Sequence, residues 1–260
     1  MLVTLTPSHP PLHPRPTHHP QAQGYGVVHF AQRLLAEKGQ SLEGKKCLIT
    51  GSHSTALAVA EKLLEYGAVP ITFTDSSGHI YEPAGFDAAK LRTIQRIKEE
   101  RGARVGRYII ASTSAKFNEF GSVYEIPCDL AFVCSSIMQA SAANVQTLAD
   151  NGCKAIIEGV HQAMSNGAIV SAKKRGLFHG PYRATTVGAS LVNGMSIALD
   201  PLKTQQGETL DSRVKAGIDR VYDEIKSTAN EFNTRGDLHA GANIAAFLRV
   251  ANVMLAHGST

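Results

Sequence analysis

The chain has 260 residues, of which 43% are hydrophobic and 18% are charged, the ordinary balance of a globular protein with a sizeable core. Its formal net charge of +4 is mild. The lysines and arginines are scattered rather than clustered, which argues against a nucleic-acid partner. No run approaches the roughly 18 consecutive apolar residues of a membrane span.

Residues 1–23 differ in composition from the rest of the chain. They contain six prolines and four histidines but no acidic residue. Because proline removes backbone hydrogen-bond donors, we expect a disordered tail, followed by one domain over residues 24–260. The lack of acids is also typical of a mitochondrial targeting segment. An intracellular protein is expected, with mitochondrial and cytoplasmic locations both left open.

After the tail, strand-like and helix-like segments alternate. Apolar residues recur at helical spacing over residues 24–38, and a short apolar run over residues 46–50 predicts a buried strand. A second helix is expected over residues 56–66, and a second strand over residues 69–74 ends at Asp75. Two strands joined by a helix form a βαβ unit, which implies a parallel sheet.

The same alternation continues toward the C-terminus. Helices are predicted over residues 87–101, 141–150, 163–175, 208–232 and 238–256, and strands over residues 130–134 and 155–157. Residues 102–125 show no clear pattern, and only helices are expected after residue 187. The sequence therefore predicts an α/β fold with a doubly wound, mostly parallel, Rossmann-like sheet and extra C-terminal helices. The last helix is amphipathic, so we expect its apolar face in the core.

The turn after the first predicted strand is similar to the glycine-rich fingerprint of a pyrophosphate site, G-x-G-x-x-G/A. In the run Gly51-Ser52-His53-Ser54-Thr55-Ala56, the first glycine and the last small residue are kept, but His53 replaces the middle glycine. That glycine lets the main chain approach the phosphates. Two interpretations follow. His53 donates to a phosphate, or its imidazole obstructs the site, and we favour obstruction.

Six segments resemble, in order, landmarks of the cofactor domain of NADP-specific glutamate dehydrogenases. They are residues 24–30, 41–45, 74–81, 127–131, 151–159 and 240–245. The resemblance extends over nearly the whole chain after the tail, and it implies a Rossmann-type domain with NADP as the expected cofactor. The cofactor-binding positions that it implies are Gly51, Ser52, His53, Ser54, Thr55, Asp75, Ser76, Ser135 and Asn243.

Several working positions of that family are altered in this chain. The family's alanine-threonine-glutamine-asparagine stretch is Ser135-Ser136-Ile137-Met138 here, which removes two amides near the nucleotide. An asparagine of the family is His161, and an asparagine and a glycine near the nicotinamide are Thr185 and Val187. The changes gather at the cofactor site while the strand and helix landmarks are kept. We therefore expect either no cofactor or weak, vestigial NADP binding.

The resemblance also bears on catalysis. In the family, a substrate domain precedes the cofactor domain and supplies the catalytic lysine and aspartate, whereas this chain has only residues 1–23 there. We therefore expect no catalytic residue and a non-catalytic structural or regulatory subunit with protein partners in a larger assembly, a mitochondrial one included. The alternative is an NADP(H)-binding oxidoreductase of amino-acid metabolism with a separate substrate domain, which Asp75, Ser76 and Asn243 favour.

The histidines could serve as general bases only if an acid oriented them. His53, His79, His161 and His179 fall near turns at the expected cleft. The sequence places no acid beside any of them, so we expect turn or surface histidines.

The cysteines are expected to be reduced, mostly buried thiols, with zinc binding as the alternative. None of the four belongs to a Cys-x-x-Cys pair or to another ligand spacing. They are Cys47, Cys128, Cys134 and Cys153. The sequence therefore predicts no metal site.

Overall fold

The computed structural model describes residues 20–192 and 209–258 of the chain. Residues 1–19 of the predicted tail lie outside the described residues. Helix α1 spans Pro20–Ala36 and so begins before the helix predicted over residues 24–38. Its first turns are held by packing: Ala22 is fully buried, and a β-carbon added to Gly24 would lie 2.6 Å from Ala58 Cβ.

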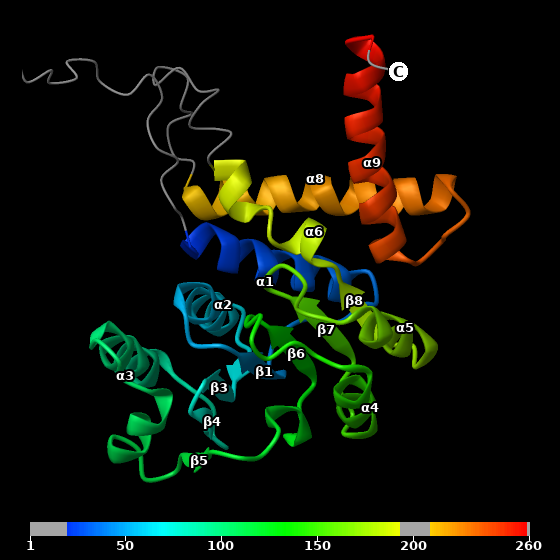
Figure 1. Cartoon of the computed structure of the whole chain (residues 1–260). Helices are drawn as coiled ribbons and strands as arrows, with labels where there is room; N and C mark the ends of the chain where they lie inside the picture. The colour runs from blue at the N-terminus through cyan, green and yellow to red at the C-terminus, as the bar shows by residue number, and fades with distance from the viewer. Residues whose placement is uncertain (1–19, 193–208, 259–260) are drawn as a thin grey trace, which may run out of the picture.

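A five-stranded parallel sheet forms the centre of the molecule, in the order β2-β1-β6-β7-β8 (Figure 1). Its strands are β1 (Lys46–Thr50), β2 (Val69–Pro70), β6 (Leu130–Val133), β7 (Ala155–Glu158) and β8 (Phe178–Gly180). The chain leaves β1 toward β2 and later returns to its other side as β6, so the strand order reverses between β1 and β6. The predicted doubly wound fold is confirmed. Strand β8 was not predicted, because it has only three residues and no alternating pattern.

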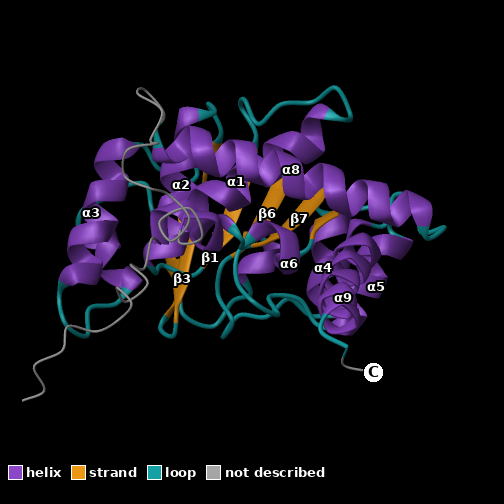
Figure 2. Cartoon of the chain, turned by 90° about the horizontal axis from the view of Figure 1, so that it is seen from above, coloured by secondary structure: helices purple, strands orange, loops and turns teal. Residues whose placement is uncertain are grey.

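Helices cover both faces of this sheet. Alternate residues of β1 point to opposite faces, so Ile49 joins the core under α1, α2 (Ser54–Glu65) and α8 (Leu210–Glu231). Leu48 joins the second core, under α4 (Ala142–Asp150) and α5 (Asn166–Lys174). Seen from above, α1 and α8 run across the strands (Figure 2). The short helix α6 (Tyr182–Thr185) follows β8.

A second, antiparallel sheet branches from the first. It consists of β3 (Thr72–Asp75), β4 (Gly78–Tyr81) and β5 (Lys116–Asn118), so the strand predicted over residues 69–74 is divided between β2 and β3. Helix α3 (Ala88–Glu99) and the 3₁₀ helices η1 (Val105–Ile110) and η2 (Val123–Glu125) complete the connection to β6.

Two threonine hydroxyls join β3 to β1. The Ile49 amide donates to Thr72 Oγ1 at 2.9 Å, and the same hydroxyl donates back to the Ile49 carbonyl at 2.9 Å. The Gly51 amide donates to Thr74 Oγ1 at 2.7 Å. At Ile49 a side-chain hydroxyl therefore takes the place of a main-chain partner, while the Thr74 amide still donates directly to the Gly51 carbonyl at 3.1 Å. This mixed pairing lets β3 leave the plane of the parallel sheet.

Helix α9 (Leu238–Ala256) projects from the body of the molecule (Figure 1), and the prediction that its apolar face is buried is wrong. Phe247 and Leu255 are each 70% exposed. Only its base is packed, where a β-carbon on Gly241 would lie 2.1 Å from the Ile225 carbonyl oxygen of α8. By length and a mean hydropathy of 1.3, α9 could cross a membrane, a test that apolar helices of soluble proteins also pass.

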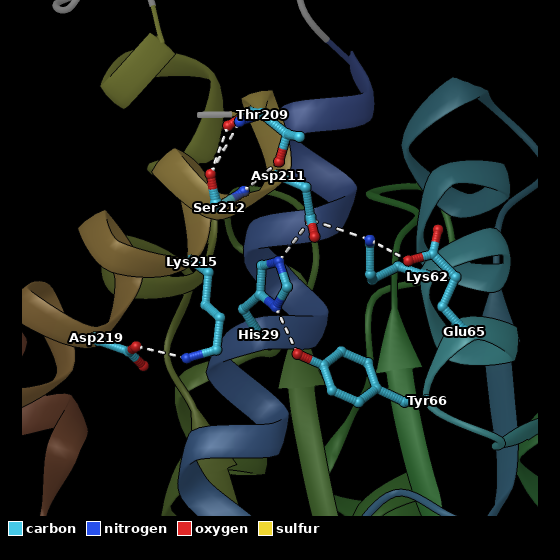
Figure 3. A network of polar contacts seen from close by, with 9 residues as sticks. All are labelled: His29, Lys62, Glu65, Tyr66, Thr209, Asp211, Ser212, Lys215 and Asp219. Carbon is cyan, nitrogen blue, oxygen red and sulfur yellow. Dashed lines mark hydrogen bonds and ion pairs between the residues drawn. The ribbon is translucent and has the colours of Figure 1, made fainter. Parts of the chain in front are cut away.

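A polar network joins α1, α2 and α8 (Figure 3). The His29 ring lies 2.9 Å from the Tyr66 hydroxyl through Nδ1 and 2.7 Å from the Asp211 carboxylate through Nε2. The Lys62 ammonium lies 3.0 Å from Asp211 and also contacts Glu65. Burial lowers the pKa of His29, so its contact with Asp211 is a hydrogen bond of a neutral ring rather than an ion pair. The network fixes α2, whose first turn faces the candidate site.

Candidate functional site

The crevice in which open α/β sheets bind ligands lies outside the carboxyl ends of the strands where the strand order reverses, here between β1 and β6. Gly51 follows β1 with φ +88°. A β-carbon at Gly51 would lie 2.8 Å from the Cys134 carbonyl oxygen and 3.4 Å from Ser135 Cβ. Only glycine fits this turn, because the backbone is left-handed and the next strand end leaves no room.

The next residues form an uncapped helix start. Ser52 is buried, and its Oγ has no hydrogen-bond partner within the described part of the chain. His53 is the N-cap of α2, with an exposed side chain that makes no capping hydrogen bond. Ser54 and Thr55 form the first turn of α2, and Ala56 is fully buried behind it. A free helix N-terminus beside an unpartnered hydroxyl suits a phosphate oxygen.

A cavity of 580 Å³ opens beside this turn. Its lining includes Ser52, His53 and Ser54, together with Gln21 of α1, Glu61 of α2 and Lys98 of α3. The cavity therefore extends from the phosphate-type turn toward the end of α3.

Asp75, at the end of β3, is held by the protein itself. Oδ1 accepts from the Ser77 amide at 2.9 Å and from the Ser77 hydroxyl at 2.6 Å. Oδ2 accepts from the Val105 amide at 2.8 Å and lies 3.4 Å from Lys98 Nζ. Burial opposes ionisation of Asp75, but the hydrogen bonds from Ser77 and Val105 outweigh it and hold its pKa below the usual value. The carboxylate is thus charged and largely occupied.

Ser76, next to Asp75, is exposed and accepts a hydrogen bond from the Arg104 guanidinium. Lys98 approaches the same corner from α3. Two cationic side chains, Arg104 and Lys98, therefore lie near the end of β3. Sequence reasoning missed both, because Arg104 lies in a segment without a clear pattern and its approach to Ser76 depends on the second sheet.

Of the remaining predicted positions, Ser135 lies beside the turn and Asn243 does not. Ser135 is buried two residues after the end of β6, while Ile137, two residues further, is 79% exposed. Asn243 is an exposed residue of α9, where its amide lies 3.0 Å from His239 Nε2. Since His239 in turn stacks on His179 of β8, Asn243 belongs to a second cluster, beside β7 and β8.

Glu158 is the centre of that second cluster. It is fully buried at the end of β7, and its carboxylate accepts from His179 at 2.9 Å and from the Met164 amide at 3.2 Å. Thr185 donates its hydroxyl to the Glu158 main-chain carbonyl. The expectation that no acid orients the cleft histidines is therefore wrong for His179. Because strand β8 was not predicted, the sequence could not bring the two residues together.

The other three histidines have no such partner in the described part of the chain. His53 and His161 are exposed, and His161 lies beside the Tyr182 ring at 5.1 Å. His79 is buried in β4, where its Nδ1 has no hydrogen-bond partner among the residues that the structure describes. Burial lowers the pKa of His79, so a neutral ring is expected.

The four cysteines are buried, as predicted, and unpaired. Among residues 20–192 and 209–258, no group of three histidine, cysteine, aspartate or glutamate side chains is arranged to hold a metal ion. The site is thus built from hydroxyls, main-chain amides and cations.

Comparison with known proteins gives one consistent family. The profile of the Glutamate/Leucine/Phenylalanine/Valine dehydrogenase family matches residues 17–258. The NADP-specific glutamate dehydrogenase of Helicobacter pylori is 35% identical over 246 residues, covering 92% of this chain and 54% of that protein. The enzyme of the same name from Chlorella sorokiniana is 32% identical, covering 92% and 46%. The chain therefore spans about half the length of the curated relatives it matches.

Solved structures agree with these matches. Plasmodium falciparum glutamate dehydrogenase 2 has a TM-score of 0.85 and 34% identity, over 92% of this chain and 53% of that one. The hetero-hexameric glutamate dehydrogenase of Thermus thermophilus has a TM-score of 0.66 and 16% identity, over 89% and 52%. The second likeness is one of fold alone.

Proposed function

Because the chain belongs to the Glutamate/Leucine/Phenylalanine/Valine dehydrogenase family, we propose that it is a nucleotide-binding subunit of a protein assembly that does not dehydrogenate a substrate by itself. The part of the family that it matches is the NAD(P)-binding domain. We propose an intracellular location, and residues 1–23 leave the choice between mitochondria and cytoplasm open.

The observation that carries nucleotide binding is the buried Ser52 hydroxyl beside the open start of α2. This hydroxyl has no hydrogen-bond partner in residues 20–192 and 209–258. A polar atom in that position normally has a partner, and a pyrophosphate oxygen would supply one. The left-handed turn at Gly51 directs the chain from β1 into α2, whose uncapped first turn lines the cavity. Ser76 and Arg104 at the end of β3 would meet the 2′-phosphate that distinguishes NADP from NAD. The residues present therefore fit an NADP-type ligand, which would supply hydride chemistry in an active relative.

The side chains near β7 and β8 support the proposal that this chain does not catalyse dehydrogenation by itself. The Glu158 carboxylate is occupied by His179 and by the Met164 amide. The Thr185 hydroxyl is turned to a main-chain carbonyl. Neither group is free to bind or to deprotonate a substrate. At the end of β6, the exposed Ile137 offers no hydrogen bond.

An oxidoreductase with a separately supplied substrate domain is the second candidate. The relatives named NADP-specific glutamate dehydrogenase favour it, as does His179, whose ring is oriented by a buried acid in the manner of a general base. Activity on glutamate would then require the partner that provides the rest of the site.

Titration with NADPH separates these functions from a purely structural role. At 100 times its dissociation constant, NADPH should add about 2.7 kcal/mol of stability, visible as a rise in the thermal midpoint. Arg104→Gln should weaken NADPH binding but leave NADH binding unchanged. Arg107→Gln is the matched control. Arg107 is an exposed arginine of η1, three residues after Arg104, and it pairs with Glu100 instead. Absence of any shift at millimolar NADPH contradicts nucleotide binding.

His53→Gly tests the obstruction by the imidazole. If the side chain stands in the path of the phosphates, the variant should bind NADPH about tenfold more tightly, which corresponds to about 1.4 kcal/mol. His53→Ala keeps the β-carbon and should gain less. Weaker binding by the glycine variant would instead mean that His53 donates to a phosphate.

Catalysis and assembly need their own measurements. We expect no reduction of NADP by the purified chain with glutamate, and unaided turnover would overturn the non-catalytic proposal. The exposed apolar helix α9 supports a role in an assembly, since such surfaces usually mark protein contacts. The hetero-hexameric Thermus protein is a precedent of the same fold. Co-purification of stoichiometric partners that is lost in Phe247→Ser would support this role, and a monomer without partners in its own cell would contradict it.

A further inference from the structure

A second cavity, of 510 Å³, lies at the β8 edge of the sheet. It is bounded by α5, β8 and the turn that joins α8 to α9. Its apolar wall consists of Leu34, Ile169, Val170, Leu177, Phe178 and Leu238. This volume and this mostly apolar lining are those of small-molecule sites. None of its residues lines the cavity beside Ser52, so the two cavities are separate.

The charged groups of this cavity leave one positive charge without compensation. Lys173 and Arg235 are cations and Asp237 is an anion, which gives a net charge of +1 when the histidines are left out of the count. Lys173 lies 2.8 Å from Asp237, and Asp237 also accepts from the Ala240 amide at the start of α9, at 2.9 Å. Arg235 is exposed and has no hydrogen bond or ion pair with the described residues.

Two stacked histidines complete the lining. The rings of His179 and His239 lie 5.6 Å apart with an angle of 25° between their planes. His179 is fixed by its hydrogen bond to the buried Glu158. Burial, followed by the nearness of His179, lowers the pKa of His239. The stacked histidines and Phe178 all line the cavity, and flat rings of this kind suit an aromatic group.

We propose that this cavity is a binding site for a small aromatic or otherwise apolar monocarboxylate. The apolar body packs against Val170, Phe178 and the stacked histidines, and the carboxylate faces Arg235. A single negative charge balances the excess positive charge of the lining, whereas a neutral ligand leaves Arg235 without a partner. This site is additional to the nucleotide site and does not depend on it.

Naphthoate is a suitable probe, with naphthamide as its uncharged counterpart. Calorimetric titration of the full chain should give saturable naphthoate binding with a dissociation constant below about 1 mM. Naphthamide should bind about fivefold more weakly, the effect of losing one exposed ion pair. Arg235→Gln should lower naphthoate affinity to the level of naphthamide. Arg101→Gln, at an exposed arginine in the turn after α3, should not change naphthoate affinity.

A bulky substitution tests the cavity itself. Val170 is 53% exposed on α5, so Val170→Trp should fill the cavity without disturbing the core and should abolish naphthoate binding. Val250→Trp makes the same change at a 60% exposed position on α9 and should bind normally. Thermal midpoints of both variants close to that of the wild type show that they are folded.

Four results would overturn the proposal: no binding at millimolar naphthoate, equal binding of naphthoate and naphthamide, normal binding by Val170→Trp, and displacement of naphthoate by NADPH. The last result would mean that the probe occupies the nucleotide cavity. Binding that is unchanged by saturating NADPH supports a separate site. A failure of NADPH to bind would count against the proposed function and leave this result intact.

Discussion

A buried hydroxyl without a hydrogen-bond partner costs about 1–3 kcal/mol. Ser52, in the turn after β1, carries a buried hydroxyl that finds no partner among the described residues. Such a cost is typical of functional positions, because a ligand can remove it on binding. Two neighbours in the same turn have no comparable cost. The exposed His53 can turn toward water. Gly51 has a left-handed backbone conformation that glycine adopts without strain.

Ser52→Ala should therefore act in opposite directions on the free and the bound protein. The free protein should be as stable as the wild type or more stable, by up to about 1 kcal/mol, since an unpartnered polar atom is removed. NADPH affinity should fall about tenfold, because a hydrogen bond to a charged phosphate is lost. Urea unfolding and NADPH titration measure the two effects. A loss of stability without ligand would show that the hydroxyl already has a partner.

His29 should make stability depend on pH. Burial lowers its pKa below the usual 6.5 in the folded protein. As the pH falls below about 6.5, the unfolded chain gains a proton that the folded chain does not, so stability falls. Above that pH the ring is neutral in both states and the contribution is complete. The carboxylate of Asp211 and the ammonium groups of Lys62 and Lys215 face the same ring.

Thermal midpoints measured between pH 8 and pH 5 test this dependence. The wild type should lose stability through this range. His29→Gln should be less stable at pH 8 but show a flatter profile, because it removes the titrating group and keeps a polar side chain. Equal slopes for the two proteins would exclude His29 as the cause.

At the scale of the elements, sequence patterns predicted the helices and strands whose formation depends mainly on neighbouring residues. Apolar runs predicted β1, β6 and β7, and α9 occupies the predicted residues 238–256. The βαβ order and the glycine turn sufficed for the parallel sheet. The strands that escaped prediction, β4, β5 and β8, have three or four residues each and include glycine, histidine, lysine or asparagine, so they lack the apolar run that marked the equally short β6 and β7.

The candidate site was predictable only in part, for the same reason. The turn at Gly51 and the acid at Asp75 could be predicted because each follows a recognisable strand. Arg104 and His179 could not, because each reaches its partner from a segment whose structure depends on tertiary contacts. Asn243 matches the family pattern, yet it lies on α9, away from the turn. Residue type alone does not give the position of a side chain on a projecting helix.

The geometry of the turn between β1 and α2 predicts that Gly51 cannot be replaced without a loss of stability. Gly51→Ala should destabilise the protein by about 1–3 kcal/mol, because it combines a left-handed backbone with a contact of 2.8 Å to the Cys134 carbonyl oxygen. Gly39→Ala is the matched control: Gly39 also has a positive φ, of 65°, but has no atom within 4 Å of an added β-carbon. The difference between their free energies of unfolding measures the close contact. Equal losses would mean that backbone strain alone acts.

At the scale of the whole molecule, the body and α9 differ in where their apolar side chains lie. The body has two cores on either side of one sheet, whereas most of the apolar side chains of α9 face outward. Apolar surface of this extent on a helix held only at its base indicates a surface shaped for contact rather than for folding.

Substitutions on α9 should therefore affect association and not folding. Phe247→Ser and Leu255→Ser should leave the free energy of unfolding within about 0.5 kcal/mol of the wild type and reduce self-association in light scattering. Ile225→Ser, on the buried face of α8, should cost several kcal/mol, on the order of 2–5. A large loss of stability from the α9 variants would mean that this helix folds back onto the body.

The junction of the two sheets at Thr72 and Thr74 sets a limit on how the domain can be re-engineered. Valine has nearly the same shape as threonine and favours strands even more, so shape-based redesign would accept it at either position. Valine would leave the buried main-chain amides of Ile49 and Gly51 without hydrogen-bond acceptors. A redesign that moves this unit to another protein must therefore keep both threonine hydroxyls. They supply hydrogen bonds that join the two sheets, and a change of loop length cannot supply them.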